Sequence, residues 1–162
     1  MLVAIISDTH MPRGERVLPR ACVERLGSAE LILHAGDVCS ASVLREIEAI
    51  GPPVHAVQGN MDEQALRTLL PAALELELEG VRVAMTHDAG PTEGRLVRMR
   101  GRFPAATAVV FGHSHMPALE TDETGFALFN PGSPTERRRA PRHTMGIARI
   151  AAGAIEFELL DV

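Results

Sequence analysis

The sequence predicts an α/β fold in which helices alternate with the strands of a parallel sheet. In the first half of the chain, short apolar runs alternate with segments whose apolar residues recur at helical spacing, an order that favours parallel strands. In the second half, the apolar runs lie closer together and are separated by glycines, which favours antiparallel strands. Polar residues follow the ends of most of these runs.

The first half predicts three strand-helix units. Each expected strand is a continuous apolar run, typical of a strand buried on both faces, and each expected helix has an apolar stripe. Ser40 or Ser42 is expected to cap the second helix, and Asp62 the third. The expected strands span residues 2–6, 31–33 and 54–57, and the expected helices span residues 16–26, 42–50 and 62–70.

The second half predicts mainly strands. Leucines alternate with glutamates over residues 74–79, which predicts a strand with one exposed face, and Gly80 turns it into a strand over residues 81–85. A helix containing Leu96 and Val97 is expected next. A buried strand over residues 109–111 follows, and the last three expected strands, taken as antiparallel, span residues 126–129, 145–150 and 155–160.

Composition favours one domain over residues 1–162. The chain has 162 residues, 46% of them hydrophobic, and contains no Trp or Tyr, so its core must be mainly aliphatic. The net charge of −5 argues against a nucleic-acid-binding or membrane-surface protein. Cys22 and Cys39 form no CxxC pair, and the opening apolar run is too short for a signal peptide. A soluble protein of the cytoplasm is expected.

An aspartate, an asparagine or a histidine follows each of five expected strands. They are separated by 29, 23, 27 and 26 residues, about one strand-helix unit each. Because ligands of open α/β sheets bind at the carboxyl ends of the strands, we expect these side chains to converge on one rim. They are Asp8, Asp37, Asn60, His87 and His113, and two more histidines, His10 and His115, lie nearby in sequence.

These side chains are ligands for divalent metals. Imidazole nitrogens and carboxyl or amide oxygens bind such ions, and there are enough of them here for two. A mixture of nitrogen and oxygen ligands without thiolate suits Mn²⁺, Fe²⁺, Co²⁺, Ni²⁺ or Zn²⁺ better than Ca²⁺.

The order of these motifs, DxH, GD, GN, H and GHxH, resembles the calcineurin-like metallophosphoesterase superfamily. More narrowly, the chain resembles the small bacterial and archaeal phosphodiesterase branch, with an NPGS segment near the end, and the resemblance extends from Asp8 to Ser133. It implies a four-layer αββα sandwich with two mixed β-sheets and a metal site at the carboxyl ends of the strands.

The resemblance also implies a role for each ligand. Asp37 would bridge two divalent ions, Mn²⁺ being the first expectation, and a metal-bridging hydroxide would hydrolyse a small phosphodiester. One metal would be held by Asp8, His10 and His115, and the other by Asn60, His87 and His113. The catalytic residues would be Asp37, Asn60, His87 and His113. A homodimer is possible among such proteins.

One position departs from the common pattern. Many superfamily members have a histidine after the GN pair, near the leaving group, whereas this chain has Met61, and a thioether cannot donate a proton. The small phosphodiesterase branch also lacks that histidine. A phosphomonoesterase or nucleotide phosphatase, or a non-catalytic interaction scaffold of the same fold, remains an alternative. His34 is either a core histidine or a residue that orients a ligand.

Overall fold

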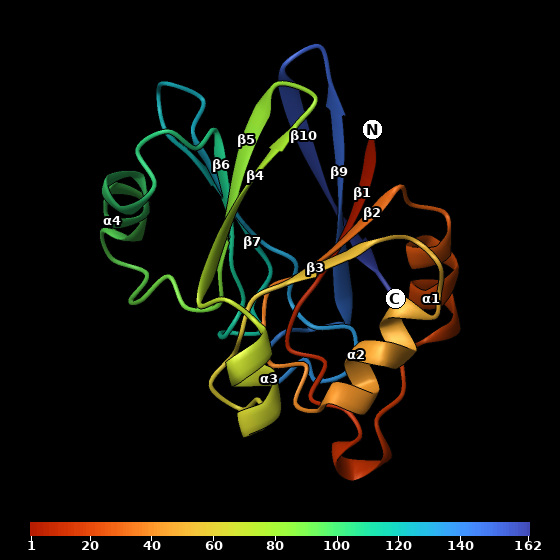
Figure 1. The fold of residues 1–162 in the computed structure, drawn as a ribbon. Coiled ribbons are helices and arrows are strands. Elements are labelled where there is room, and N and C mark those ends of the chain that lie inside the picture. The colour runs from red at the N-terminus through yellow and green to blue at the C-terminus, as the bar shows by residue number, and fades with distance from the viewer.

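Two five-stranded sheets pack face to face in the computed structural model, which describes residues 1–162 (Figure 1). The first sheet has the order β10-β9-β1-β2-β3 and the second the order β4-β5-β6-β8-β7. The first consists of β1 (Leu2–Ile6), β2 (Leu31–His34), β3 (Val54–Ala56), β9 (Thr144–Ala151) and β10 (Ala154–Asp161). The second consists of β4 (Ala73–Leu78), β5 (Val81–Thr86), β6 (Ala108–Val110), β7 (Ala118–Thr121) and β8 (Ala127–Asn130).

Both sheets are mixed. Strands β1, β2 and β3 are parallel, and β9 and β10 extend that sheet in antiparallel fashion. In the second sheet β5, β6 and β8 are parallel, with β4 and β7 antiparallel at its edges. Residues 126–129 were expected to form an antiparallel strand. That expectation was wrong for the pairing of β8 with β6, which is parallel.

Helices cover the outer face of each sheet. Apolar side chains of α1 (Arg20–Gly27), α2 (Ala41–Glu48) and α3 (Gln64–Leu69) pack with Ala4 and Ile6 of β1. On the other side, α4 (Arg95–Arg102) packs through Met99 against the second sheet. A short 3-10 turn, η1 (Arg13–Glu15), precedes α1. Each helix is too short or too polar to span a bilayer.

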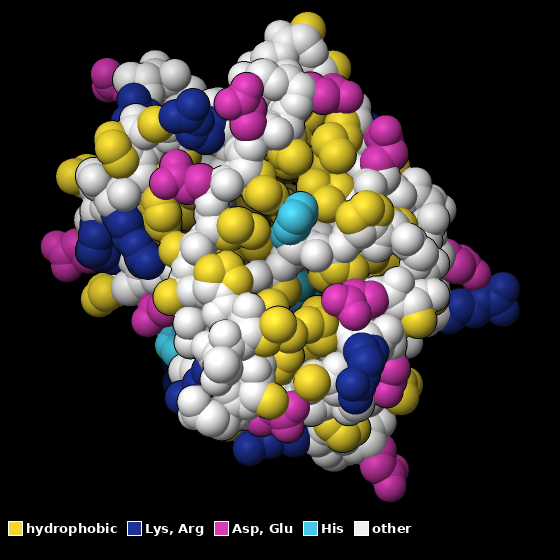
Figure 2. All heavy atoms as spheres, in the orientation of Figure 1, with side chains coloured by type: hydrophobic (Ala, Val, Ile, Leu, Met, Phe, Trp, Pro, Cys, Tyr) yellow, Lys and Arg dark blue, Asp and Glu magenta, His cyan; other side chains and the backbone are white.

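Alternation along the strands produces the layers. In β1, Val3 and Ile5 face the second sheet and join its Val83 and Met85 in one core, whereas the intervening side chains face the helices. Hydrophobic side chains are visible between the two sheets in the centre of the face shown in Figure 2. These layers confirm the αββα sandwich that the resemblance implied.

Two helix starts differ from the sequence-based expectation. Helix α1 begins at Arg20 rather than Arg16, because a proline at position 19 disfavours the helical conformation in the residue before it. Asp62 does not cap α3, since its carboxylate accepts hydrogen bonds from the backbone amides of Cys39 and Gly59 instead, both at 2.7 Å. Ser40 caps α2 as expected, accepting from the Val43 amide at 3.4 Å.

Candidate metal centre

The loops that leave five strands meet at one end of the sandwich. Asp8, Asp37 and Asn60 follow β1, β2 and β3 of the first sheet. His87 and His113 follow β5 and β6 of the second. Because both sheets direct the carboxyl ends of these strands to the same end, side chains from two sheets come within hydrogen-bonding distance of one another.

Five of the seven predicted ligands have a left-handed backbone. Non-glycine residues rarely adopt a positive φ, and such conformations gather at functional sites, where the surrounding structure holds them. The φ angles are 55° at Asp8, 46° at His10, 57° at Asp37, 67° at His113 and 58° at His115. The backbone conformation of these loops therefore orients particular side chains and does more than connect two elements.

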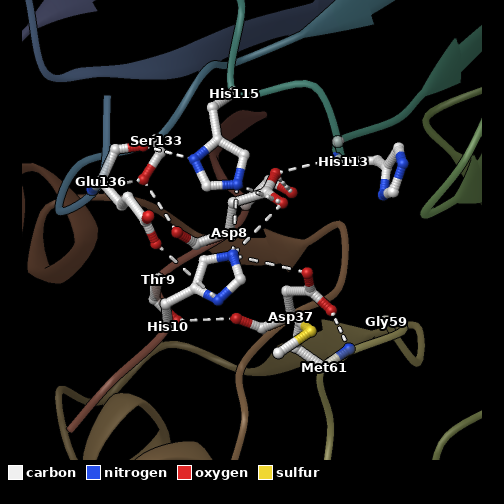
Figure 3. Close-up of polar contacts among 12 residues, drawn as sticks. Asp8, Thr9, His10, Asp37, Gly59, Met61, His113, His115, Ser133 and Glu136 are labelled. Carbon is white, nitrogen blue, oxygen red and sulfur yellow. Dashed lines mark hydrogen bonds and ion pairs between the residues drawn. The ribbon is translucent and has the colours of Figure 1, made fainter. Parts of the chain in front are cut away.

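The first group of predicted ligands is Asp8, His10 and His115, all fully or almost fully buried. The Oδ1 atom of Asp8 lies 3.3 Å from Nε2 of His115 and 3.9 Å from Nε2 of His10. Both histidine rings point toward the Asp8 carboxylate in Figure 3. These three atoms surround a space in which one cation could bind.

The two oxygens of Asp8 have different surroundings. Oδ2 accepts hydrogen bonds from the Ser7 hydroxyl at 2.6 Å and from the His113 amide at 3.0 Å. Oδ1 is buried and has no hydrogen-bond partner. A buried carboxylate oxygen without a donor is costly, and one that faces imidazole nitrogens fits a bound cation.

Backbone carbonyls determine the tautomers of two histidines. Nδ1 of His87 donates to the Ala35 carbonyl at 2.7 Å, and Nδ1 of His115 donates to the Glu136 carbonyl. Because a carbonyl can only accept, each Nδ1 carries the hydrogen, and in the neutral ring Nε2 keeps its lone pair toward the site. This is the usual arrangement for metal-binding histidines.

Asp37 lies between the two groups of ligands. Its Oδ2 is 3.4 Å from Nε2 of His10 and 3.3 Å from Nε2 of His87. Asp8 Oδ1 is farther from the same two atoms, at 3.9 Å and 4.0 Å. The other oxygen of Asp37 accepts from the Met61 amide at 2.7 Å, which holds the carboxylate in place. Of the two carboxylates, Asp37 is better placed to bridge two cations.

The second group consists of Asn60, His87 and His113. Asn60 Oδ1 lies 3.1 Å from His87 Nε2 and 2.9 Å from His113 Nδ1. Asn60 and His113 are exposed, unlike the first group, and all three line a cavity of about 370 Å³. A ligand therefore has direct access to the second group.

Burial and neighbouring charges shift the pKa values of these side chains. Burial raises the pKa of Asp37, but His87, the Met61 amide and His10 together outweigh it and lower that pKa to about 2. Burial lowers the pKa of His87, but Asp37 and Asp8 outweigh it and raise that pKa to about 9. Burial lowers the pKa of His10, so its ring is neutral and can bind a metal at neutral pH. Without metal, His87 and Asp37 form an ion pair.

The segment after the NPGS motif supports the site in a way that sequence reasoning missed. The Ser133 hydroxyl donates to the Asp8 carbonyl at 2.8 Å, and the Thr135 hydroxyl donates to the Thr9 carbonyl at 2.6 Å. The Glu136 carboxylate lies 3.9 Å from Nδ1 of His10. The motif indicated only the resemblance to the phosphodiesterase branch, and no spacing in the sequence connects it with residues more than 120 positions earlier.

His34 lies outside both groups. It is fully buried, and its Nε2 is 3.1 Å from the Thr9 hydroxyl. Burial lowers its pKa to about 4, so the ring is neutral. His34 contacts Thr9, which lies between the predicted ligands Asp8 and His10 in sequence. It therefore belongs to the core beneath the site.

A four-layer sandwich with nitrogen and oxygen ligands gathered at one end is the architecture of a metal-dependent phosphoesterase. The calcineurin-like phosphoesterase superfamily domain matches residues 1–153. A protein named probable metallophosphoesterase from Methanothermobacter thermautotrophicus is 36% identical over 163 residues, which cover 99% of this chain and 92% of that protein. The chain belongs to the calcineurin-like phosphoesterase superfamily, whose members are phosphoester hydrolases that use divalent metal ions.

Solved structures show the same fold at lower identity. Wild-type Vps29 from Entamoeba histolytica, complexed with zinc, has a TM-score of 0.78 and 20% identity, with 99% of both chains covered. A structure described as a novel archaeal phosphodiesterase has a TM-score of 0.74 and 21% identity, covering 99% of this chain and 100% of that one.

Proposed function

We propose that this chain is a phosphodiesterase that uses two divalent cations, with Mn²⁺ as the first candidate. The observation that carries this proposal is the position of Asp37 Oδ2, 3.4 Å from a histidine of the first group and 3.3 Å from a histidine of the second. One cation would be held by Asp8, His10, His115 and Asp37. The other would be held by Asn60, His87, His113 and the same Asp37 carboxylate.

The two cations would neutralise phosphoryl oxygens and lower the pKa of bound water, so that hydroxide is available at neutral pH. The chain positions the ligands for this chemistry. The Ala35 and Glu136 carbonyls hold the His87 and His115 rings, and the Met61 amide holds Asp37. No serine, cysteine or histidine nucleophile is required.

Met61 limits the choice of substrate. Its backbone amide contacts Asp37, but its thioether cannot protonate a leaving group. No lysine or tyrosine is present anywhere in the chain to take that role. Hydrolysis should therefore depend steeply on the acidity of the leaving alcohol, and an aryl diester should react much faster than an alkyl diester.

The preference for diesters is supported by the archaeal phosphodiesterase among the structures of similar fold and by the resemblance to the small phosphodiesterase branch. The test is a comparison of bis-p-nitrophenyl phosphate with p-nitrophenyl phosphate, using protein stripped of metal and reloaded with Mn²⁺. We expect the diester to have the higher kcat/KM.

Asp37→Asn is expected to lower kcat/KM for the diester by at least about a hundredfold, because it removes the shared negative charge. His55→Ala is the matched control, since His55 is an exposed histidine on β3 outside the site. Full activity of Asp37→Asn would overturn the proposal. A higher kcat/KM for the monoester would favour the phosphomonoesterase, and inactivity with every metal would favour the interaction scaffold.

A further inference from the structure

Two arginines lie in the cavity beside the second group of ligands. Arg67 lies in helix α3, which follows β3 of the first sheet. Arg102 is the last residue of helix α4, which follows β5 of the second sheet. Both line the cavity of about 370 Å³ that also contains Asn60, His87 and His113. Dark blue side chains gather on the left flank in Figure 2, where α4 lies.

Neither arginine is neutralised by a carboxylate. Two other arginines of α4 have such partners: Arg95 pairs with Glu120 and Arg100 pairs with Asp122. No ion pair within 4.0 Å involves Arg67 or Arg102. The chain as a whole has a net charge of −5, but these two arginines lie in one cavity without a carboxylate partner.

The guanidinium of Arg67 is held by hydrogen bonds, and that of Arg102 has one cation–π contact. Nε of Arg67 donates to the Asp62 carbonyl at 2.8 Å and Nη2 donates to the Asn60 carbonyl, which leaves Nη1 without a partner in the chain. The guanidinium of Arg102 lies 4.9 Å from the centre of the Phe103 ring. A cation that is already positioned loses less conformational freedom when it binds an anion.

The rest of the lining suits a compact polar ligand. Ala72 is the one hydrophobic residue of the lining, and no aromatic ring other than imidazole is present on which a nucleobase could stack. Asp88 is the one carboxylate, and its Oδ1 already accepts from the Gly90 amide at 2.6 Å. Planar guanidinium groups match carboxylate and phosphate oxygens well.

We propose that Arg67 and Arg102 determine specificity by binding a second anionic group of the substrate. The preferred substrate is a small phosphoester whose other part carries a carboxylate or a second phosphate, rather than a nucleoside. This inference rests on the proposed function, because the scissile phosphate is taken to lie at Asn60, His87 and His113.

The test measures binding and does not require turnover. Calorimetry on Mn²⁺-loaded protein compares 3-phosphonopropionate with propylphosphonate, which differ only in the distal carboxylate, and adds propane-1,3-bisphosphonate to separate carboxylate from phosphate. We expect at least one doubly anionic ligand to bind about tenfold more tightly than propylphosphonate. Equal affinity of all three ligands would overturn the inference even if diester hydrolysis is observed. A preference for the doubly anionic ligands would stand even if no diester is hydrolysed.

Variants assign the preference to the two arginines. Arg102→Gln touches no predicted metal ligand and is expected to remove most of the tenfold preference. Arg67→Gln also frees the Asn60 carbonyl, so its Mn²⁺ content is measured, and Arg67→Lys serves as the variant that keeps the charge. Arg45→Gln, at an exposed position of α2 outside the cavity, should leave the preference unchanged. A full preference in both Arg102→Gln and the double variant Arg67→Gln, Arg102→Gln would overturn the assignment.

Discussion

The Nε2 atoms of His10 and His115 lie 3.2 Å apart in a pair of stacked rings whose centres are separated by 5.0 Å. In His115 the hydrogen is on Nδ1, where it is donated to the Glu136 carbonyl. The Nε2 lone pair of His115 therefore points at His10. A cation bound to both nitrogens at bond lengths of about 2.0–2.1 Å is compatible with this separation.

Metal binding should stabilise the folded chain. A ligand present at a hundred times its Kd contributes about 2.7 kcal/mol, which for a chain of this length raises Tm by about 5–10 °C. Thermal unfolding in EDTA and after Mn²⁺ loading measures this shift. His115→Ala should lose it and His55→Ala should keep it, whereas an equal shift in both variants would argue against the site.

Gly59 is expected to be essential for the position of Asp37. A Cβ atom at residue 59 would lie 2.1 Å from both the backbone nitrogen and Oδ1 of Asp37. Gly59→Ala must therefore displace the Asp37 carboxylate and should lower Mn²⁺ affinity by at least about tenfold, with a loss of about 1–3 kcal/mol in the free energy of unfolding. Gly101→Ala is the matched control, because a Cβ there meets no atom within 4 Å. Unchanged Mn²⁺ affinity in Gly59→Ala would contradict the geometry.

Metal affinity should fall as the pH falls. The pKa of His87 is raised to about 9 in the metal-free site, so at neutral pH this ring must lose a proton before Nε2 can bind a metal. Below about pH 9, the affinity of the second group should drop about tenfold per pH unit, and one proton should be released per metal bound there. Calorimetry in buffers of different ionisation enthalpy counts that proton. Binding without proton release at pH 7 would show that His87 is neutral.

Acid should destabilise the metal-free protein through His34. Its pKa is lowered to about 4 in the folded state from an ordinary value of 6.5, so the unfolded chain takes up the proton first. The associated stability is present above pH 6.5 and is lost as the pH falls to about 4, a change of about 3 kcal/mol. Denaturant unfolding in EDTA across this range measures it. His10 acts in the same direction, whereas the His87 contribution is constant below pH 6.5.

His34→Gln should flatten this pH dependence while keeping an amide near the Thr9 hydroxyl. His55→Gln, at an exposed position, should retain the wild-type slope. An unchanged slope in His34→Gln would place the acid sensitivity elsewhere.

Much of the fold could be predicted because burial leaves a pattern along the chain. The continuous run at residues 2–6 became β1, and the leucines alternating with glutamates at residues 74–79 became β4, whose hydrogen-bonded partner is β5. Strand β7 (Ala118–Thr121) was not predicted, because it is a short, half-exposed edge strand stabilised by its pairing with β8. The direction of β8 relative to its neighbours could not be predicted either, since the same residues can form a parallel or an antiparallel pair, depending on the neighbouring strand.

The sequence by itself determined which side chains lie at the strand ends and predicted that they bind metal, because apolar runs predict strands and parallel strands share an end. Only the tertiary structure decided how each ligand is held. The free oxygen of Asp8, the carbonyls of Ala35 and Glu136, and the unpaired charges of Arg67 and Arg102 depend on contacts between distant segments. Such contacts leave no periodic pattern in the sequence, because they form where loops from the two sheets meet.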